Sequence, residues 1–451
     1  MRFQLIPLSR LPYIKVRNQN SIDTTYHKSN LMSIFPKDFL WGAATSSHQV
    51  EGGNHNDWSE WEHANSARLA AEAARRHAKT HMRIPDYILS RYPNPLQEEN
   101  YISGRACDHY HRFREDFDIA KSLGHNAHRF SIEWSRIEPE EGKFDEKEIE
   151  HYREVICALR ERGLEPFVTL WHWTNPVWVR DFGAEENKKF IFYFIRYVEC
   201  MVKNFGDMVH FWITINEPTS VIWQGYSRGT QPPGKKSFVS AMHVFNNLVV
   251  AHKKSYQTIH AIDPSAHVGF ANFIIPMDPY RRNFLDSLSS FVANFLANRY
   301  FLHKTGRYND FLTVQYYSGV KIQFPASIIR EEGEKSDLGW LIYPEGIYHI
   351  LKDLSKYKKP IYITENGLAD AKDAKRGKFL ADHLSWVAKA IEEGVDIRGY
   401  FHWSLLDNFE FPELRGFWPR FGLVEIDYKT MERKIRPSAY AYRDIIMKKE
   451  S

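Results

Sequence analysis

The amino-acid sequence predicts an α/β fold in which eight parallel strands close into a (β/α)8 barrel, the TIM barrel. Eight short runs of β-branched and aromatic residues alternate with longer amphipathic stretches, a pattern typical of repeated strand–helix units. Reactive side chains recur where these runs end, as expected when all strands direct their carboxyl ends to one mouth. A doubly wound open sheet is the rival fold. It is disfavoured because no glycine-rich phosphate loop follows an early run.

The expected strands and helices are spread over the whole chain. The strand candidates are Phe39–Ala44, Ala127–Ile132, Pro166–Leu170, Phe211–Ile215, His267–Ala271, Phe311–Gln315, Ile361–Thr364 and Arg398–Trp403. The clearest helical patterns run from His151 to Gly163, from Ser240 to Ile262 and from Phe379 to Glu393. The first and third patterns stop at Gly163 and Gly394, and the second is closed by Asp263-Pro264; glycine and proline are common helix stop signals.

One domain is expected to take up most of the chain. The chain has 451 residues, of which 43% are apolar and 26% charged, a balance that supports one large core. Residues 32–451 are assigned to the barrel, and residues 63–104 to an insertion in the loop after the first strand. Residues 1–31 are basic with only a short apolar run, so we expect either a disordered arm or an extension before the true start at Met32.

Composition excludes several classes of partner. The net charge is +4 and the basic residues are dispersed, which argues against nucleic acid as a ligand. No apolar stretch reaches membrane-spanning length, so no membrane partner is expected. The three cysteines, an odd number without metal-ligand spacing, predict a reducing and therefore cytoplasmic location; they are Cys107, Cys157 and Cys200. The 13 tryptophans indicate either a large core or a cleft where aromatic rings stack on sugars.

Two carboxylates stand out among the side chains at the strand ends. The strand-end residues are Gln49, Arg129, His172, Asn216, Glu217, Tyr317, Glu365, Asn366, Trp403 and Glu410. Glu217 and Glu365 each stand beside an asparagine at the end of a strand. Glycoside hydrolysis needs two such groups, one to protonate the leaving oxygen and one to attack or to activate water. A surface carboxylate or a helix cap would explain either glutamate alone, but the paired setting favours the catalytic interpretation.

Six sequence blocks in order resemble glycoside hydrolase family 1, and the similarity extends from Phe35 to Ala441. The blocks are FLWGAATSSHQVEGG (Phe39–Gly53), HRFSIEWSRIEP (His128–Pro139), TLWHWTNP (Thr169–Pro176), TINEP (Thr214–Pro218), YITENG (Tyr362–Gly367) and WSLLDNFE (Trp403–Glu410). One block alone would be weak support, whereas six in the same order make a chance match implausible.

The resemblance implies a retaining mechanism with Glu365 as the nucleophile and Glu217 as the acid/base. Arg129 and Tyr317 would donate to Glu365 and favour its ionised form. Glu217 would lie against apolar walls such as Trp171 or Trp173, which raises the pKa of its carboxyl so that it arrives protonated. The two carboxyl groups are expected about 5–5.5 Å apart, the spacing of retaining enzymes.

The resemblance also implies a set of residues that bind the terminal sugar. They are Gln49, His172, Asn216, Trp403, Glu410, Phe411 and Trp418. Asn216 would bond the 2-hydroxyl, and Glu410 would accept from the hydroxyls at positions 4 and 6. A carboxylate at that place disfavours 6-phospho-sugars, because it repels a phosphate.

This sequence departs from the family pattern at two of the site positions. Gln315 stands where the family usually has asparagine, so its amide lies one methylene further out. Phe411 stands where tryptophan is common, so the 3-hydroxyl of the sugar loses an indole N–H partner unless Trp418 or Arg415 replaces it. These changes are expected to weaken or alter the selectivity for the sugar.

The sequence therefore predicts an exo-acting β-glycosidase for β-glucosides, β-galactosides or β-fucosides, with no cofactor and no metal. Its expected partners are small β-glycosides or short oligosaccharides, and a homo-oligomer remains open. A non-catalytic sugar-binding barrel is an alternative, although such relatives typically lose one catalytic carboxylate. A mainly transglycosylating enzyme is another, because it would use the same residues. The DHYH stretch at Asp108–His111 is interpreted as a helix start, since no third ligand follows at zinc-site spacing.

Overall fold

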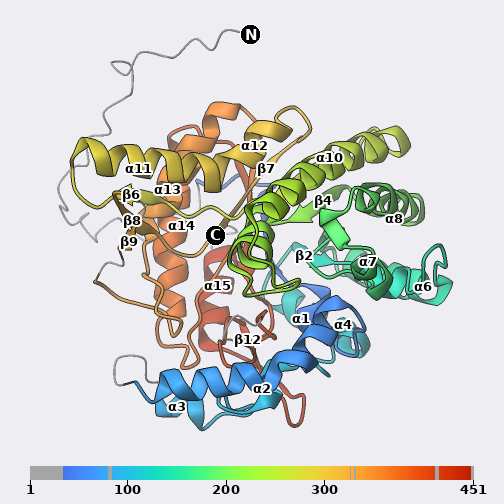
Figure 1. The fold of residues 1–451 in the computed structure, drawn as a ribbon, viewed down its shortest axis with the longest axis horizontal. Coiled ribbons are helices and arrows are strands. Elements are labelled where there is room, and N and C mark those ends of the chain that lie inside the picture. The colour runs from blue at the N-terminus through green and yellow to red at the C-terminus, as the bar shows by residue number, and fades with distance from the viewer. Residues whose placement is uncertain (1–33, 80–83, 326, 330–331, 412–415, 448–451) are drawn as a thin grey trace.

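Eight parallel strands form a barrel with helices around it (Figure 1). The structure is a computed structural model that describes residues 34–79, 84–325, 327–329, 332–411 and 416–447. The arm expected at residues 1–31 lies outside the described residues. The predicted (β/α)8 barrel is confirmed.

The barrel strands agree with the predicted ones to within one or two residues at each end. They are β1 Leu40–Ala44, β2 Ala127–Ser131, β3 Glu165–Thr169, β4 Phe211–Asn216, β5 His267–Ala271, β7 Leu312–Tyr316, β10 Ile361–Asn366 and β11 Ile397–Trp403. They pair in the order β5, β4, β3, β2, β1, β11, β10, β7. Backbone hydrogen bonds from Gln315 N to Asn272 O (2.9 Å) and from Ile274 N to Gln315 O (3.0 Å) close the ring beside β7.

Most helices lie between consecutive strands and cover the outside of the barrel. The longer ones are α2 Asp57–His77, α4 His109–Ser122, α6 Glu146–Glu161, α8 Lys189–Phe205, α10 Phe238–Ile262, α11 Phe284–Asn294, α13 Pro344–Leu354, α14 Arg376–Glu392 and α15 Pro437–Met447. The shorter ones are α1 Ser47–Val50, α3 Asp86–Leu89, α5 Trp134–Ile137, α7 Val177–Asp181, α9 Pro218–Val221 and α12 Tyr300–Thr305. Single 3₁₀ turns occur at η4 Glu98–Tyr101, η5 Ala184–Glu186 and η8 Ser355–Tyr357, and π turns at η6 Ile222–Arg228 and η7 Phe295–Arg299.

Helix α6 begins five residues before the predicted start at His151. The side chain of Asp145 accepts hydrogen bonds from the backbone N–H groups of Lys147 and Glu148, and so caps the first turn. That turn carries charged residues and has no apolar periodicity, so a search for periodicity misses it.

The segment after β1 contains α2, which begins at Asp57, and the assignment of residues 63–104 to an insertion stays a prediction. Asn56 and Ser59 cap α2 reciprocally, each side chain accepting from the other's backbone N–H. Leu69, Ala70 and Ala73 of α2 pack on Tyr101, and α2 and α3 extend along one edge of the molecule (Figure 1).

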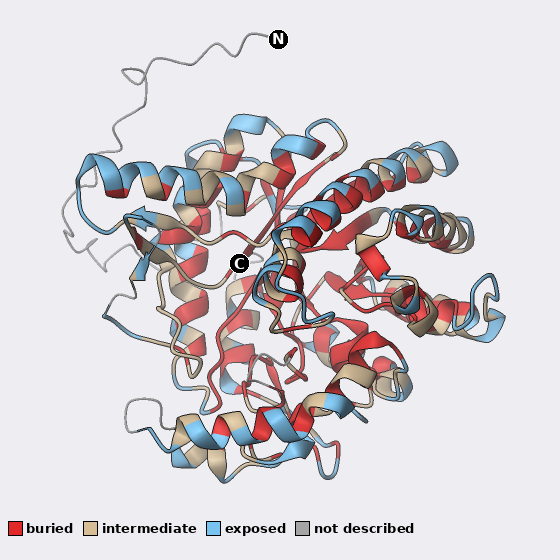
Figure 2. Ribbon diagram, viewed as in Figure 1, coloured by how far each residue is buried: buried red, intermediate tan, exposed pale blue. Residues whose placement is uncertain are grey.

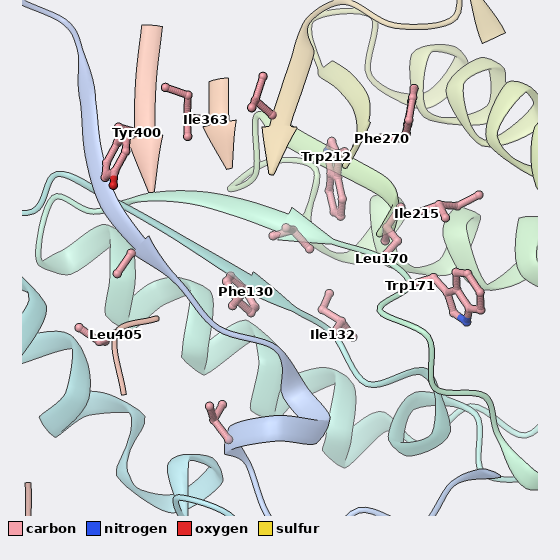
Figure 3. Close-up of a cluster of buried hydrophobic side chains, with 14 of the residues drawn as sticks. Phe130, Ile132, Leu170, Trp171, Trp212, Ile215, Phe270, Ile363, Tyr400 and Leu405 are labelled. Carbon is pink, nitrogen blue, oxygen red and sulfur yellow. The ribbon is translucent and has the colours of Figure 1, made fainter. Parts of the chain in front are cut away.

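Two separate hydrophobic clusters stabilise the barrel. The larger one fills the space between strands and helices, where Figure 3 shows side chains such as Phe130, Trp212 and Tyr400. The smaller one lies inside the barrel and includes Phe167 and Phe401. Buried residues accordingly concentrate on the strands, while the outer helix faces are exposed (Figure 2). Both faces of each strand are therefore buried, as expected for a parallel barrel.

Two small sheets outside the barrel were not predicted. One joins β6 Met277–Pro279, β8 Val320–Gln323 and β9 Ser327–Ile329, and the other pairs β12 Val424–Ile426 with β13 Arg433–Ile435. These strands are only three or four residues long, too short for an alternating pattern to be recognised. Within the described part of the chain, no helix combines the length and apolar character needed to cross a membrane.

Candidate active site

Several of the predicted strand-end side chains meet at the carboxyl-end mouth of the barrel. All eight strands are parallel, so their carboxyl ends face the same way. Side-chain hydrogen bonds there join β2, β4, β7 and β10, whose residues are up to 236 positions apart in sequence. The barrel thus assembles one polar cluster from distant segments.

The carboxylate of Glu365 is held by three donors from two other segments, β2 and the end of β7. Arg129 Nη1 and Gln315 Nε2 both donate to its Oε1, and the hydroxyl of Tyr317 donates to its Oε2 at 2.6 Å. All but the half-buried Tyr317 are buried. The expected contacts of Arg129 and Tyr317 are present. The bond from Gln315 was not predicted, although its position at a strand end was a usable signal.

The side-chain amide of Asn216 connects this network, because it hydrogen-bonds to Arg129, Gln315 and His172. Its Oδ1 accepts from Arg129 Nη2 at 2.6 Å and from Gln315 Nε2 at 2.9 Å, so its amide orientation is fixed. Its Nδ2 therefore donates to His172 Nε2 at 3.1 Å. Burial and the nearby charge of Arg129 lower the pKa of His172 well below its ordinary value. His172 is thus neutral and carries its proton on Nδ1, which has no partner among the described residues and can donate to a ligand.

Glu217 adopts a backbone conformation that is uncommon for a residue with a side chain. Its φ and ψ are 42° and 61°, in the left-handed region. The conformation is held by the bond from Glu217 N to Ala271 O (2.9 Å) and by Pro218, which starts α9 directly after it. Backbone strain of this kind clusters at functional sites, where the surrounding structure enforces it.

Strand β10 is irregular at the position of Glu365. Its pairing with β7 shifts register between Ile363 and Glu365. Register shifts next to active sites commonly re-aim a side chain. Two residues later only glycine fits, because a Cβ on Gly367 would lie 1.9 Å from the carbonyl oxygen of Trp403. The glycine of the Glu-Asn-Gly motif is therefore required by the close approach of this segment to β11.

The two carboxyl groups differ in their affinity for protons. Burial, and next the charge of Glu365, raise the pKa of Glu217 to about 8. Burial also raises the pKa of Glu365, but the charge of Arg129 and hydrogen bonds from Tyr317, Arg129 and Gln315 act in the opposite direction. For Glu217, the opposing influences are a hydrogen bond from the side chain of Ser220 and the charge of Arg129, and they do not offset the effect of burial. The pair therefore binds its first proton at Glu217 and leaves Glu365 ionised.

Trp403, Glu410 and Gln49 lie on connected segments at the same mouth. The indole N–H of Trp403 donates to Glu410 Oε1 at 3.0 Å, which fixes the carboxylate beside the ring. Gln49 Nε2 donates to the carbonyl of Phe409 at 2.8 Å, and its Oε1 accepts from the hydroxyl of Ser46 at 2.7 Å. Gln49 of α1 and the predicted residues from the end of β11 are therefore joined through the segment that precedes Glu410.

Phe411 is enclosed by four other rings. Its centroid lies 4.4 Å from Trp58, 4.8 Å from Trp173, 5.6 Å from His48 and 6.1 Å from His172. Trp58 and His48 belong to α2 and α1, and neither was predicted to be part of the site. Their contact with Phe411 is tertiary, so no local pattern in the sequence reveals it.

Three other expectations for this site have different outcomes. Trp171, considered as a wall beside Glu217, lies in the core, where it contacts Phe190 and donates to Asn175. Trp418 is half-buried, and its expected role stays a prediction. Arg415 lies outside the described residues.

The DHYH stretch behaves as a helix start. Asp108 precedes α4, where His109 pairs with Asp116 at 2.7 Å and His111 with Asp108 at 2.9 Å. Within the described ranges, no group of three or more His, Cys, Asp or Glu residues is arranged to hold a metal ion.

A cavity of about 340 Å³ lies at the opposite, amino-end mouth of the barrel. Residues near the starts of strands line it, including Leu40, Phe211 and Tyr362, and none of the predicted site residues does. Because barrel enzymes use the carboxyl-end mouth, the polar cluster around Glu365 remains the candidate active site.

Comparison with known proteins identifies relatives that match nearly the whole chain. The model of "Glycosyl hydrolase family 1" matches residues 31–327 and 321–451. "Beta-glucosidase A" of Acetivibrio thermocellus is 34% identical over 469 residues, covering 91% of this chain and 98% of that protein. The "Beta-galactosidase" of Pyrococcus woesei is 28% identical over 523 residues, covering 92% and 97%.

Solved structures extend the similarity to three dimensions. The "beta-glycosidase from Pyrococcus horikoshii" has a TM-score of 0.80 and 37% identity, covering 92% of this chain and 95% of that one. The "Beta-glucosidase from Thermotoga maritima in complex with glucoimidazole" has a TM-score of 0.79 and 30% identity, covering 92% and 99%. The similarity thus includes the whole barrel and not a local motif.

Proposed function

This chain belongs to glycosyl hydrolase family 1, and we propose that it is a retaining exo-β-glycosidase for terminal β-glucosides, β-galactosides or β-fucosides. Family membership identifies it as a glycoside hydrolase with relatives named as β-glucosidases and a β-galactosidase. One observation carries the proposal. Two buried carboxyl groups share the mouth of the barrel, and their surroundings give them different proton affinities.

In the first step, a carboxylate oxygen of Glu365 attacks the anomeric carbon of the bound sugar. The bond from that carbon to the aglycone oxygen breaks, and the proton of Glu217 moves to this oxygen as the alcohol leaves. Its pKa of about 8 keeps Glu217 protonated at neutral pH, so that it can act as the general acid. The products are a free alcohol and a glycosyl ester on Glu365.

In the second step, the ionised Glu217 takes a proton from water, and the water oxygen attacks the anomeric carbon. The ester bond to Glu365 breaks and the sugar leaves with its original β configuration. The guanidinium of Arg129 and the hydroxyl of Tyr317 stabilise the departing carboxylate, as they hold it in the free protein. Two inversions at one carbon therefore give net retention.

The sugar is positioned by the polar groups that surround this pair. We assign the 2-hydroxyl to Asn216, whose orientation Arg129 and Gln315 fix, and a further hydroxyl to the free Nδ1 proton of His172. Trp403 forms the floor under the ring, with Gln49 and Glu410 at the distal hydroxyls. A related β-glucosidase from Thermotoga maritima has been solved in complex with deoxynojirimycin, and this supports a site that binds sugar-like molecules.

The carboxylate of Glu410 makes the site unsuited to 6-phosphorylated sugars. Like charges at close range repel strongly in a partly buried site, and Trp403 holds this carboxylate in place. We therefore propose neutral glycosides and short oligosaccharides as substrates. The three cysteines are free thiols, which supports the proposed cytoplasmic location.

Aryl β-glycosides with one aglycone and different sugars test the proposed function. We expect hydrolysis of the glucoside, galactoside and fucoside, and little of the 6-phosphoglucoside. Proton NMR of the first product should show the β anomer. Initial release of the α anomer would contradict the retaining scheme. Sugar binding without turnover at any pH would favour a non-catalytic barrel, and predominant glycosyl transfer to sugar acceptors would identify a transglycosylase.

A further inference from the structure

His48 is a buried residue that is not among the proposed catalytic residues, and its ring stacks on the ring of Phe411. We propose that His48, held by Glu62, is a positioning residue that fixes the ring of Phe411 and thereby the affinity for the terminal sugar. The inference rests on the proposed function, since it concerns the sugar-binding part of the same site. It assigns a role to α2, from which Glu62 comes.

The rings of His48 and Phe411 lie nearly parallel. Their interplanar angle is 8°, with centroids 5.6 Å apart, and Phe411 is in turn within 19° of the plane of His172. His172 continues the stack to Trp403, at 6.2 Å and 26°. A column of four rings therefore runs from the buried side of the site to the proposed floor under the sugar.

Hydrogen bonds at both nitrogens fix the plane of His48. Its Nε2 lies 2.7 Å from Glu62 Oε1, and its Nδ1 lies 3.0 Å from Asn56 Nδ2. Glu62 is itself fixed, because its Oε2 accepts from the backbone N–H and the hydroxyl of Ser103 at 2.8 and 2.7 Å. All four residues are buried. A ring bonded at both edges cannot rotate, so it presents a rigid face to Phe411.

The position of the proton on His48 follows from the cap of α2. Asn56 uses its only amide oxygen to accept from Ser59 N at 2.9 Å, so its NH₂ faces His48 Nδ1. Nδ1 must then accept, and Nε2 carries the proton toward Glu62. If Nδ1 of His48 also carried a proton, that N–H would compete with the backbone N–H of Ser59 for the amide oxygen of Asn56. Protonation therefore breaks either the cap of α2 or the bond that orients the ring.

The charges around His48 determine the pH at which this second proton binds. Burial lowers the pKa of His48, but the carboxylates of Glu62, Glu133 and Asp57 outweigh it and raise the pKa above its ordinary value. Glu62 and Asp57 come from α2, and Glu133 from the segment after β2. His172 lies on the other side of the Phe411 ring. The positive charge of a protonated His48 lowers the pKa of His172, which keeps His172 neutral.

A double-mutant cycle between His48 and Phe411 tests whether the histidine acts through the phenylalanine. His48→Gln keeps a donor for Glu62 and removes the ring, and Phe411→Leu keeps most of the volume and removes the ring. We expect each single change to raise KM for an aryl β-glucoside about three- to tenfold, with kcat altered less than about twofold. The double variant should show no more than the larger single effect. Additive effects would overturn the proposal.

A matched control separates positioning from general loss of stability. Asp116→Asn weakens the contacts of another buried carboxylate, with His109 at 2.7 Å and with Arg433 at 2.9 Å, and none of these three is a predicted site residue. KM should stay unchanged in this variant even if its melting temperature falls. If His48→Gln fails to fold, Glu62→Gln replaces it: a rise in KM that is absent in the Phe411→Leu background supports the proposal, and no rise contradicts it.

The pH dependence of sugar binding gives a second readout that does not require turnover. Calorimetric titration with D-glucose should show affinity falling as pH decreases through the raised pKa of His48. The His48→Gln protein should lack this step. A wild type that binds glucose with this dependence but hydrolyses no glycoside would refute the proposed function alone. Hydrolysis with identical pH dependence in both proteins would refute only the role of His48.

Discussion

The proposed active site has two walls that are built in different ways. The Glu365 wall, made of Glu365, Arg129, Asn216, Gln315 and Tyr317, is a network of charges and hydrogen bonds. The Phe411 wall, made of Phe411, His48, Trp58, His172 and Trp173, is an assembly of ring contacts. The Glu365 wall determines the ionisation of the proposed nucleophile. The Phe411 wall determines the shape of the proposed sugar-binding space.

This difference predicts two kinds of mutational effect. Hydrogen bonds and charges aimed at a reacting carboxylate matter most in the transition state, so changes in the Glu365 wall should lower kcat. Ring contacts act on bound substrate and transition state alike, so changes in the Phe411 wall should mainly raise KM. Asn216 and His172, which hydrogen-bond to each other, connect the two walls.

The largest effect is expected for Glu365→Gln, which removes the proposed nucleophile. Turnover of an aryl β-glucoside should fall by about 10⁴-fold or more, because no covalent intermediate can form. The amide oxygen can still accept from Arg129 and Gln315, and the NH₂ group can donate to the hydroxyl oxygen of Tyr317, so circular dichroism and melting temperature should stay close to wild type. Substantial residual activity in a clean preparation would contradict the assignment of Glu365.

The next largest effect is expected for Glu217→Ala, which removes the proposed acid. Substrates with poor leaving groups should lose about 10²- to 10⁴-fold in kcat, and activated aryl glycosides much less. Added azide should restore the second step and give the β-glycosyl azide, identified by NMR. Formation of the α-azide would show that the attack occurs from the other face.

Gln315 tests the Glu365 wall at a residue that does not react. In Gln315→Leu, Glu365 and Asn216 each lose a buried donor, so kcat should fall about 10- to 100-fold and KM should change little. Gln315→Asn, which keeps an amide, should lie between this variant and wild type. A change confined to KM would place Gln315 with the Phe411 wall instead.

The smallest effects are expected in the pH dependence of kcat/KM. Glu217 must be protonated in the free enzyme, so activity should fall as pH rises through its pKa of about 8. Glu365 must be ionised, so activity should also fall as pH decreases through its raised pKa. Glu217→Gln should remove the alkaline limb from the profile of an activated substrate. An unchanged limb would assign it to another group.

The barrel and the meeting of its strand-end residues could be predicted from sequence because both follow from local pattern and topology. A strand buried on both faces reads as a short apolar run, as in β5, whose predicted and observed bounds agree. Parallel order then brings Asn216 and Glu365 to one mouth. These inferences need no knowledge of side-chain packing.

The sequence did not predict contacts that depend on tertiary packing. His48 is adjacent to Gln49 in the chain, but its role depends on Glu62, 14 residues away on α2, and on Phe411 in a distant loop. The direct bond from Gln315 to Glu365 was missed for a related reason. The length of a side chain indicates its reach, but its direction is decided by the neighbours that surround it.

Trapping with a 2-deoxy-2-fluoro aryl β-glucoside is the most direct test of the central claim that Glu365 and Glu217 act on one anomeric carbon. The fluorine slows the second step more than the first when the leaving group is good, so the glycosyl-enzyme should accumulate. Peptide mapping by mass spectrometry should locate one sugar on Glu365, in the segment Tyr362–Gly367. A label on Glu217, or complete hydrolysis without any labelled peptide, would contradict the account.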